Sequence, residues 1–345
     1  MLYSLPMKFR AIRFPSVVFS AATLLAACGG MTGTGADTGA SSDGSGQDAS
    51  TMDMGTAADA SPSDSCGDSP VVTPNPMVGH SNYVPTNFPA ATPVRLIVLG
   101  DSISDGTGAS AASLQYANLL ANNNDTQYPT EATTDLQSRY GGADAGAFPV
   151  LHIAVGGATT YSMWRDQLPA LRNMFPIRGH SLAVITIGGN DLVAALASGG
   201  APDGQVLTDA INYLTQTATF LHDPANFPDG VSLVLATVYD PTDGEGFARN
   251  CFLNLRVPQF IPGLDVWRER YRMLGMSMNF AVVDALGHFH GHAKNYMHVC
   301  NPYYDTANPV QWFSTADCIH PGDLGHNEFR RLFFQAVDPT YVVER

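Results

Sequence analysis

The stretch from Val94 to Gly106, which reads VRLIVLGDSISDG, constrains the fold of this 345-residue chain more than any other. Four apolar residues in a row, 96–99, are followed at once by Gly100, Asp101 and Ser102. A short apolar run closed by glycine is typical of a parallel strand buried on both faces. In open α/β folds, ligands bind at the carboxyl ends of such strands. Ser102 is therefore a candidate nucleophile at the edge of a sheet.

The rest of the chain alternates between apolar runs and segments with helical spacing. Strands are expected at 96–99, 150–155, 181–187, 231–238 and 280–283. Helices are expected at 111–121, 130–140, 162–175, 207–222, 265–278 and 328–337. Strands separated by helices favour a parallel sheet covered on both faces. We predict an α/β fold, a three-layer α/β/α sandwich around a mostly parallel, five-stranded sheet.

The N-terminus has the pattern of an export signal. Lys8, Arg10 and Arg13 precede an apolar run over 14–27, which is too short to span a bilayer as a stable helix. The residues LAAC at 25–28 resemble the lipobox of bacterial lipoproteins. We expect 1–27 to be a lipoprotein signal peptide, Cys28 to be lipidated, and the protein to be anchored at the outer membrane or cell surface. The alternative is ordinary cleavage, with Cys28 incidental.

Residues 28–91 are predicted to be a flexible tether, because 29–70 consist almost wholly of Gly, Ala, Ser, Thr and Asp. Composition becomes that of a globular protein from about residue 92, so 92–345 are expected to form one catalytic domain, which we expect to act as a monomer. The formal net charge of −14 disfavours binding to nucleic acid, because such binding depends on neutralising phosphates with basic residues. Contact with the membrane is expected through the lipid anchor only.

Four cysteines remain once Cys28 is set aside: Cys66, Cys251, Cys300 and Cys318. In an oxidising compartment such cysteines form disulfides, and four of them allow three pairings. The sequence does not choose among these pairings. Metal binding is the weaker interpretation, since no C-x-x-C spacing is present.

A candidate base for Ser102 lies near the C-terminus. Asp317 and His320 are three residues apart, which on one helical turn would place their side chains on the same face. Asp317 could then accept a hydrogen bond from one ring nitrogen and leave the other for Ser102. Pro321 restricts the backbone of His320. The alternative is an ordinary turn with a surface histidine.

Gly157 and Asn190 each follow a predicted strand and are candidate oxyanion donors. Acyl transfer places negative charge on the carbonyl oxygen, and fixed donors aimed at that oxygen stabilise the transition state. A glycine allows a backbone N–H to approach closely, and an Asn amide adds a neutral donor. The alternatives are a glycine turn at the end of a strand and a helix N-cap at Asn190 or Asp191.

The segments around Ser102, Gly157, Asn190 and His320 occur in the order that is typical of the SGNH, or GDSL-type, hydrolase superfamily. The chain resembles that superfamily over about residues 94–340. The resemblance implies that Ser102 is the nucleophile, His320 the base and Asp317 its partner. It also implies an oxyanion hole made of the Ser102 backbone N–H, Gly157 and Asn190. Two positions depart from the family pattern: Ile103 stands where Leu is usual, and His152 where many members have Asn.

The resemblance implies a flavodoxin-like fold and a serine hydrolase that cleaves carboxylic esters through an acyl-enzyme, with no cofactor and no metal. The substrate would be a small-molecule ester or, alternatively, an acetylated polysaccharide. A non-catalytic surface-binding module is a third hypothesis. The α/β-hydrolase elbow G-x-S-x-G is excluded because residue 104 is Ser, and no phosphate-binding glycine motif follows a strand.

One cluster stays outside this scheme. His288, His290 and His292 alternate, so on an extended segment they would share a face, with Asp284 close by. A metal site is one interpretation of this pattern, and a loop without a catalytic role is the other.

Overall fold

The computed structural model describes residues 82–141, 146–248 and 257–343. At its centre lies a five-stranded sheet in the order β2-β1-β3-β4-β5, in which every neighbouring pair is parallel. The strands are β1 (Arg95–Gly100), β2 (Val150–His152), β3 (Ser181–Thr186), β4 (Val231–Ala236) and β5 (Ala281–Val283). The predicted α/β class and the five-stranded parallel sheet are confirmed.

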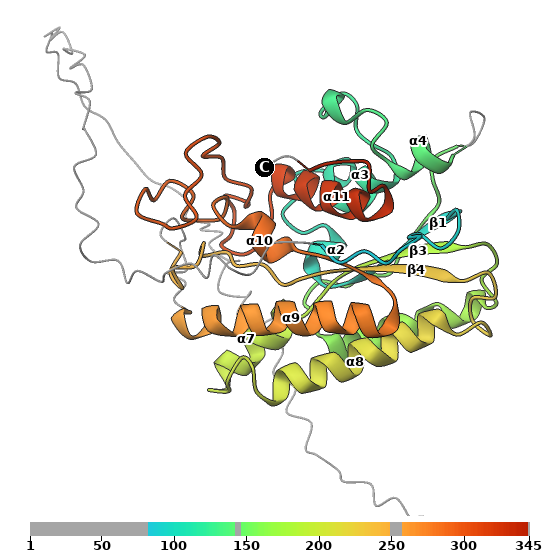
Figure 1. Ribbon diagram of the computed structural model, residues 1–345, viewed down its shortest axis with the longest axis horizontal. Helices are drawn as coiled ribbons and strands as arrows, with labels where there is room; N and C mark the ends of the chain where they lie inside the picture. The colour runs from blue at the N-terminus through green and yellow to red at the C-terminus, as the bar shows by residue number, and fades with distance from the viewer. Residues whose placement is uncertain (1–81, 142–145, 249–256, 344–345) are drawn as a thin grey trace, which may run out of the picture. The chain divides into compact units, whose positions relative to one another are not determined.

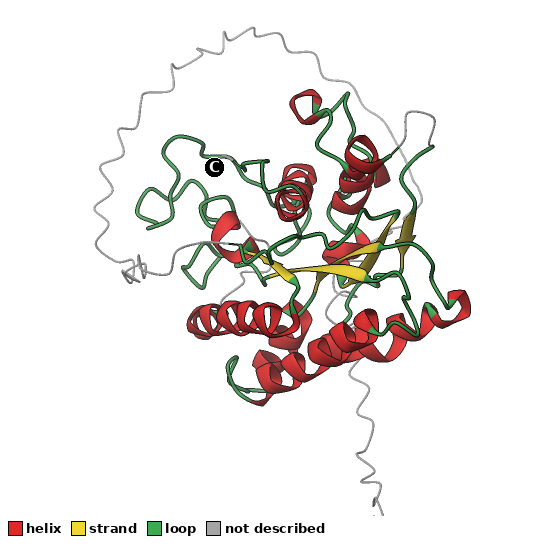
Figure 2. Ribbon diagram, turned by 45° about the vertical axis from the view of Figure 1, so that its right-hand side comes forward, coloured by secondary structure: helices red, strands yellow, loops and turns green. Residues whose placement is uncertain are grey.

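Helices cover the sheet on both faces, as Figures 1 and 2 show. One face carries α7 (Gly189–Ala197), α8 (Gln205–His222) and α9 (Ile261–Met278), which follows the short turn η6 (Pro258–Phe260). The opposite face carries α3 (Tyr116–Ala121), α4 (Leu136–Tyr140), α10 (Ala285–Phe289) and α11 (Asp323–Val337). The three-layer sandwich is thus confirmed. No helix in the described ranges is long and apolar enough to cross a membrane.

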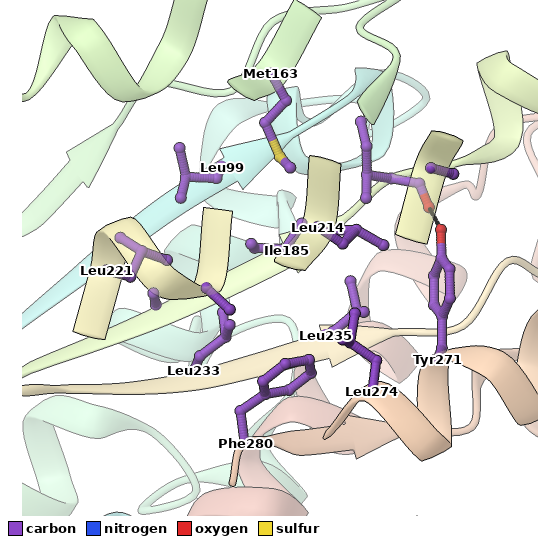
Figure 3. Close-up of a cluster of buried hydrophobic side chains, with 14 of the residues drawn as sticks. Leu99, Met163, Ile185, Leu214, Leu221, Leu233, Leu235, Tyr271, Leu274 and Phe280 are labelled. Carbon is purple, nitrogen blue, oxygen red and sulfur yellow. Dashed lines mark hydrogen bonds between the residues drawn. The ribbon is translucent and has the colours of Figure 1, made fainter. Parts of the chain in front are cut away.

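Strand β1 is apolar on both faces because each face packs against a helical layer. Ile97 and Leu99 belong to the cluster on the α8 and α9 side, and Leu96 and Val98 belong to the cluster on the α3 and α11 side. All four are fully buried. Figure 3 shows the first cluster, in which strand residues meet leucines of α8. Alternation of side chains along the strand therefore explains the unbroken apolar run.

Several helices differ from the sequence-based expectation. The helix expected at 111–121 is divided by Gln115, which is extended, into the 3₁₀ turn η2 (Ala112–Leu114) and α3. The segment 130–140 contains the 3₁₀ turn η3 (Pro129–Glu131) and then α4, with Thr133 at a positive φ of 83° between them. Local backbone reversals, which hydropathy does not encode, account for both divisions.

The helix expected at 162–175 is a chain of short turns. It begins with α5 (Thr160–Ser162), widens into the π turn η4 (Met163–Gln167), and continues as α6 (Leu168–Ala170) and the 3₁₀ turn η5 (Arg172–Met174). Pro169 is the second residue after the π turn, so the missing N–H of proline falls where the regular helical hydrogen bonding is already interrupted. The helix α7 was not expected.

The segment ahead of the predicted domain boundary belongs to the fold. Tyr83 pairs antiparallel with Val282 through two backbone hydrogen bonds of 2.8 and 2.7 Å, on the free edge of β5. Asn82 donates to the side chain of Gln335 on α11 at 2.7 Å. Residues 82 and 83 therefore belong to the folded part, although the boundary of the domain was expected at residue 92. Residues 1–81, with the expected signal and most of the tether, lie outside the described residues.

Candidate active site

Ser102 lies at the carboxyl end of β1, at the start of the short helix α2 (Ser102–Asp105). The chain turns at Gly100, which has a φ of +124° and a Cβ position only 2.1 Å from the carbonyl oxygen of Thr186. Only glycine fits there. Asp101 caps α2 by accepting the Ile103 N–H at 3.1 Å. This strand–turn–helix arrangement places Ser102 at the sheet edge where the sequence predicted it.

A buried network of hydroxyl groups holds α2 against the sheet through hydrogen bonds. The Ser104 Oγ lies 2.7 Å from both the Tyr116 hydroxyl and the Thr186 Oγ1, and it accepts the Thr186 N–H at 3.1 Å. Thr186 in turn donates to the Asp101 carboxylate at 2.9 Å. Burial raises the pKa of Asp101 to about 7, although hydrogen bonds from Thr186 and Ile103 act in the opposite direction. A carboxyl that ionises near neutral pH thus lies one residue before Ser102.

The structure brings Ser102, His320 and Asp317 together. The Nε2 of His320 lies 2.8 Å from the Ser102 Oγ, and its Nδ1 lies 3.0 Å from the Asp317 Oδ2. Burial favours neutral Asp317, but hydrogen bonds from the His320 ring and from the backbone N–H groups of His320 and Ile319 outweigh it and lower its pKa to about 2. Asp317 therefore holds one ring nitrogen as a donor and leaves the other facing the serine hydroxyl.

The expectation that Asp317 and His320 share a helical turn is wrong. They lie on an irregular bend, in which the Asp317 Oδ1 accepts the backbone N–H groups of Ile319 at 2.8 Å and His320 at 2.7 Å. A single carboxylate thus closes the bend with one oxygen and holds the imidazole with the other. Local side chain–backbone hydrogen bonds of this kind replace helical ones at Asp residues.

The bend is anchored at both ends. Phe313 and Pro321 form an antiparallel bridge, and Ser314 donates its N–H to the His320 carbonyl at 2.9 Å. The Tyr239 hydroxyl donates to the Ile319 carbonyl at 2.5 Å. A Cβ at Gly108 would lie 2.2 Å from the Pro321 carbonyl oxygen, so the loop after α2 packs directly against this bend. Contacts from several parts of the chain therefore set the position of His320.

Gly157 lies beside the nucleophile in an open loop. Its φ is +78°, and apart from its chain neighbours no residue in the described ranges has an atom within 4 Å of its Cβ position. The preceding residue, Gly156, has its Cβ position 4.0 Å from the Ser102 Cβ. The loop therefore runs next to Ser102 and leaves room for a bound group on the side of Gly157.

Asn190 is the second residue of α7, which begins after β3 with Gly188 as its N-cap. Neither Asn190 nor Asp191 is therefore the N-cap. The Asn190 amide donates one hydrogen bond to the Ala158 carbonyl at 2.9 Å. This bond orients the amide beside the loop of Gly157, and its nitrogen has a second hydrogen to donate.

Some residues that shape the site carried no signal in the sequence. Gln167 holds the backbone of Gly100 from η4, and Tyr239 and Lys294 hold the bend of His320. The buried Lys294 ammonium donates to the Ser314 carbonyl. His152, where the family pattern has Asn, lies with its Nε2 2.9 Å from the Ser104 carbonyl oxygen. Each acts on a residue far away in the sequence, so no local pattern reveals it.

The three alternating histidines do not share a face. His288 lies in α10 with its Nε2 2.9 Å from a Glu328 carboxylate oxygen, whereas His290 stacks on Tyr303 with ring centroids 3.9 Å apart. His292 stacks on Trp312 with ring centroids 3.7 Å apart, and the His288 ring lies 4.9 Å from the same indole, a different partner from that of His290. The extended segment assumed for them is therefore wrong. Among the residues that the structure describes, no group of three or more His, Cys, Asp or Glu could hold a metal ion.

A family model matches most of the described chain. The profile described as "GDSL-like Lipase/Acylhydrolase" matches residues 96–333, which run from β1 to α11 and contain all five predicted site residues. No curated protein matches the chain. Of the other candidate residues, Cys28, Cys66 and Cys251 lie outside the described residues.

Solved structures with a similar arrangement have low sequence identity to this chain. A protein described as a GDSL-like lipase from Parabacteroides merdae is 17% identical, with 71% of this chain and 96% of that chain covered and a TM-score of 0.44. An acetylxylan esterase from Geobacillus stearothermophilus is 17% identical, with 73% and 97% covered and a TM-score of 0.43. An α/β hydrolase from the metagenome of Lake Arreo, Spain, is 18% identical, with 72% and 96% covered and a TM-score of 0.44.

Proposed function

The chain belongs to the family of GDSL-like lipases and acylhydrolases, and from that premise we propose that it hydrolyses carboxylic esters through an acyl-enzyme formed on Ser102. The observation that carries the proposal is the pair of contacts made by one imidazole: His320 Nε2 to Ser102 Oγ at 2.8 Å and His320 Nδ1 to Asp317 Oδ2 at 3.0 Å. A base within hydrogen-bond distance of a serine hydroxyl, oriented by a carboxylate, is the arrangement that activates serine for attack.

In the first half of the reaction, the Ser102 Oγ attacks the ester carbonyl carbon while its proton passes to His320 Nε2. The imidazolium that forms is stabilised by the Asp317 carboxylate. The carbonyl oxygen becomes an oxyanion, and we assign its donors as the backbone N–H groups of Ser102 and Gly157 and the side-chain amide of Asn190. When the tetrahedral intermediate collapses, the C–O bond to the alcohol breaks and His320 gives its proton to the leaving oxygen.

In the second half, water takes the place of the alcohol. His320 removes a proton from the water as its oxygen attacks the acyl carbon, and the same three donors hold the new oxyanion. The bond to Ser102 Oγ then breaks, and the proton returns from His320 to the serine. The products are a carboxylic acid and the free enzyme. Every proton moves between named groups, so the cycle needs no further reactant.

The proposal is tested by turnover of p-nitrophenyl acetate and butyrate, together with labelling by a fluorophosphonate that reacts with activated serines. We expect wild-type protein to hydrolyse these esters and the label to be found on Ser102 by peptide mass spectrometry. Ser102→Ala should lose both. Ser198→Ala, at the exposed end of α7, is the matched control and should retain both. Full activity in Ser102→Ala would overturn the assignment, and absence of turnover and labelling in the wild type would favour a non-catalytic binding module.

Deacetylation of a polysaccharide is the second candidate function. The observation that favours it is the space beside the oxyanion donors: among the described residues other than its chain neighbours, none has an atom within 4 Å of a Cβ placed at Gly157. We propose that a bulky alcohol would lie on this open side of the site. Acetate release from acetylated xylan, compared with hydrolysis of p-nitrophenyl esters of increasing acyl length, distinguishes a carbohydrate esterase from a lipase-like enzyme.

We also propose that the enzyme is exported and held at the cell envelope through a lipid on Cys28. The basic segment, the short apolar run and the LAAC sequence at 25–28 support this proposal. We propose that Cys300 and Cys318 take part in disulfide bonds, as an oxidising compartment would allow, and the pairing of the four cysteines stays a prediction. Incorporation of a clickable fatty acid into wild-type protein but not into Cys28→Ser, followed by membrane fractionation, tests the anchor.

A further inference from the structure

The side chain of Gln167 holds the backbone of Gly100 with two hydrogen bonds. Its Oε1 accepts the Gly100 N–H at 2.9 Å, and its Nε2 donates to the Gly100 carbonyl at 2.7 Å. Gln167 is 3% exposed and is the last residue of the π turn η4. Gly100 is two residues before Ser102, so this amide acts directly on the turn that carries the nucleophile.

Gln167 supplies the partner that the Gly100 N–H lacks beyond the end of β2. The neighbouring strand β2 ends at His152 and pairs with β1 only as far as Val98. Beyond that register the Gly100 N–H and carbonyl still face the side of β2, because Val155 donates its N–H to the Gly100 carbonyl at 3.2 Å. Buried backbone groups of this kind need partners. The amide of Gln167 supplies one partner for the N–H and a second one for the carbonyl.

The Gly100 carbonyl therefore accepts hydrogen bonds from two elements at once. One donor is Gln167, and the other is Val155, which lies two residues before Gly157 on the loop beside Ser102. The turn that carries the Ser102 N–H and the loop that carries the Gly157 N–H thus meet at a single oxygen. Displacement of that oxygen would change the distance between two of the three donors that we assign to the oxyanion.

The π turn explains how Gln167 reaches this position. Met163, Gln167 and Leu168 are all buried, so the widened turn directs an amide toward β1 while its apolar neighbours stay in the core. π turns are rare and occur frequently at functional sites.

We propose that Gln167 is a positioning residue that sets the relative placement of the Ser102 and Gly157 backbone N–H groups, and through them the geometry of the oxyanion hole. This inference rests on the ester hydrolase function proposed above. Gln167 touches no substrate atom. Its effect is on how well two donors, which lie on different elements, point at the same oxygen in the transition state.

The test replaces Gln167 by Met, which has similar length and no hydrogen-bonding amide. In active-site-titrated enzyme, we expect kcat/KM for p-nitrophenyl butyrate to fall about tenfold to a hundredfold, mostly in kcat, since small misplacements of catalytic donors have effects of this size. Trifluoromethyl ketones form a tetrahedral adduct with the serine that needs the same donors. Their inhibition constants should therefore rise by a factor similar to the fall in kcat/KM, while KM changes less than threefold.

A merely structural role gives a different result. Leu221→Ala, in the buried cluster behind the sheet, serves as a control because it lowers stability without contacting Gly100. Its thermal midpoint should fall, but the titrated enzyme should keep wild-type kcat/KM and ketone inhibition. If Gln167→Met does not fold, Gln167→Leu provides the same comparison. Ketone inhibition and kcat/KM within twofold of wild type in either folded variant would overturn the proposal. Fluorophosphonate labelling of wild-type Ser102 tests the hydrolase function separately.

Discussion

Asp191 accepts two hydrogen bonds from Thr160: one from the backbone N–H at 2.9 Å and one from the hydroxyl at 2.7 Å. Asp191 follows Asn190 on α7, and Thr160 begins α5 directly after the loop of Gly157. The two proposed oxyanion donors outside α2 are therefore joined through a buried carboxylate, although they lie on separate elements. Burial raises the pKa of Asp191, and both bonds from Thr160 oppose that rise.

Thr160→Val removes the hydroxyl bond to Asp191 and keeps the shape of the side chain. We expect kcat to fall about tenfold and the free energy of unfolding to fall by about 1–3 kcal/mol, because a buried carboxylate loses a partner. Steady-state kinetics and urea denaturation measure the two effects. Thr219→Val, which removes a hydroxyl on the exposed side of α8, is the control and should change neither. Unchanged kcat in Thr160→Val would show that this link does not position the donors.

Asp317→Asn should reduce kcat by about 10³–10⁴-fold with little change in fold. The Asn Oδ1 can still accept the backbone N–H groups of Ile319 and His320, so the bend persists. The Asn amide, however, donates where the carboxylate accepted, which favours the tautomer of His320 that cannot take the Ser102 proton. Initial rates and circular dichroism check this prediction. Loss of less than tenfold would mean that Asp317 does not orient the base.

Asp101→Asn should change how stability depends on pH. The folded pKa of Asp101 is raised from 3.8 to about 7, so its contribution is fully present below pH 4 and is lost as the pH rises through about 7. Asn can keep both hydrogen bonds, since both go to Oδ1, and it does not ionise. The thermal midpoint of the variant relative to wild type should therefore increase by several degrees between pH 4 and pH 8. A difference that stays constant over this range would contradict the prediction.

Three glycines should respond differently to substitution by Ala. Gly100→Ala would place a Cβ 2.1 Å from the Thr186 carbonyl oxygen, and we expect it to prevent folding. The Cβ of Gly157→Ala would meet no neighbouring side chain that the structure describes but would be strained by the φ of +78°, so we expect folded protein with kcat about ten- to hundredfold lower. Gly189→Ala has open space and no positive φ, so it is the control with near wild-type activity. Thermal melting and initial rates measure all three, and wild-type kcat in Gly157→Ala would exclude this glycine from the oxyanion hole.

The fold class could be predicted because its signal is local. Every residue from Leu96 to Leu99 must be apolar when both faces of β1 are covered, and the glycine after it must allow a sharp turn. The same holds for β3 and β4, which were located to within two residues of their observed ends. The divided helices, the π turn and the extension to residue 82 were missed, because they depend on contacts with other parts of the chain.

From the amino-acid sequence one can read the class of fold, the order of the family motifs and the residue types available for catalysis. The distances between the catalytic groups depend on the tertiary structure. Ser102 and His320 are 218 positions apart in the chain, yet the His320 Nε2 lies 2.8 Å from the Ser102 Oγ. The tertiary structure also decided that Asp317 acts through a bend rather than a helix, and that Gln167 completes the hydrogen bonding of Gly100. Strand register is set by pairing across the sheet, and buried polar groups find their hydrogen-bond partners there too. The paired residues lie far apart in the chain, so no local pattern encodes these contacts.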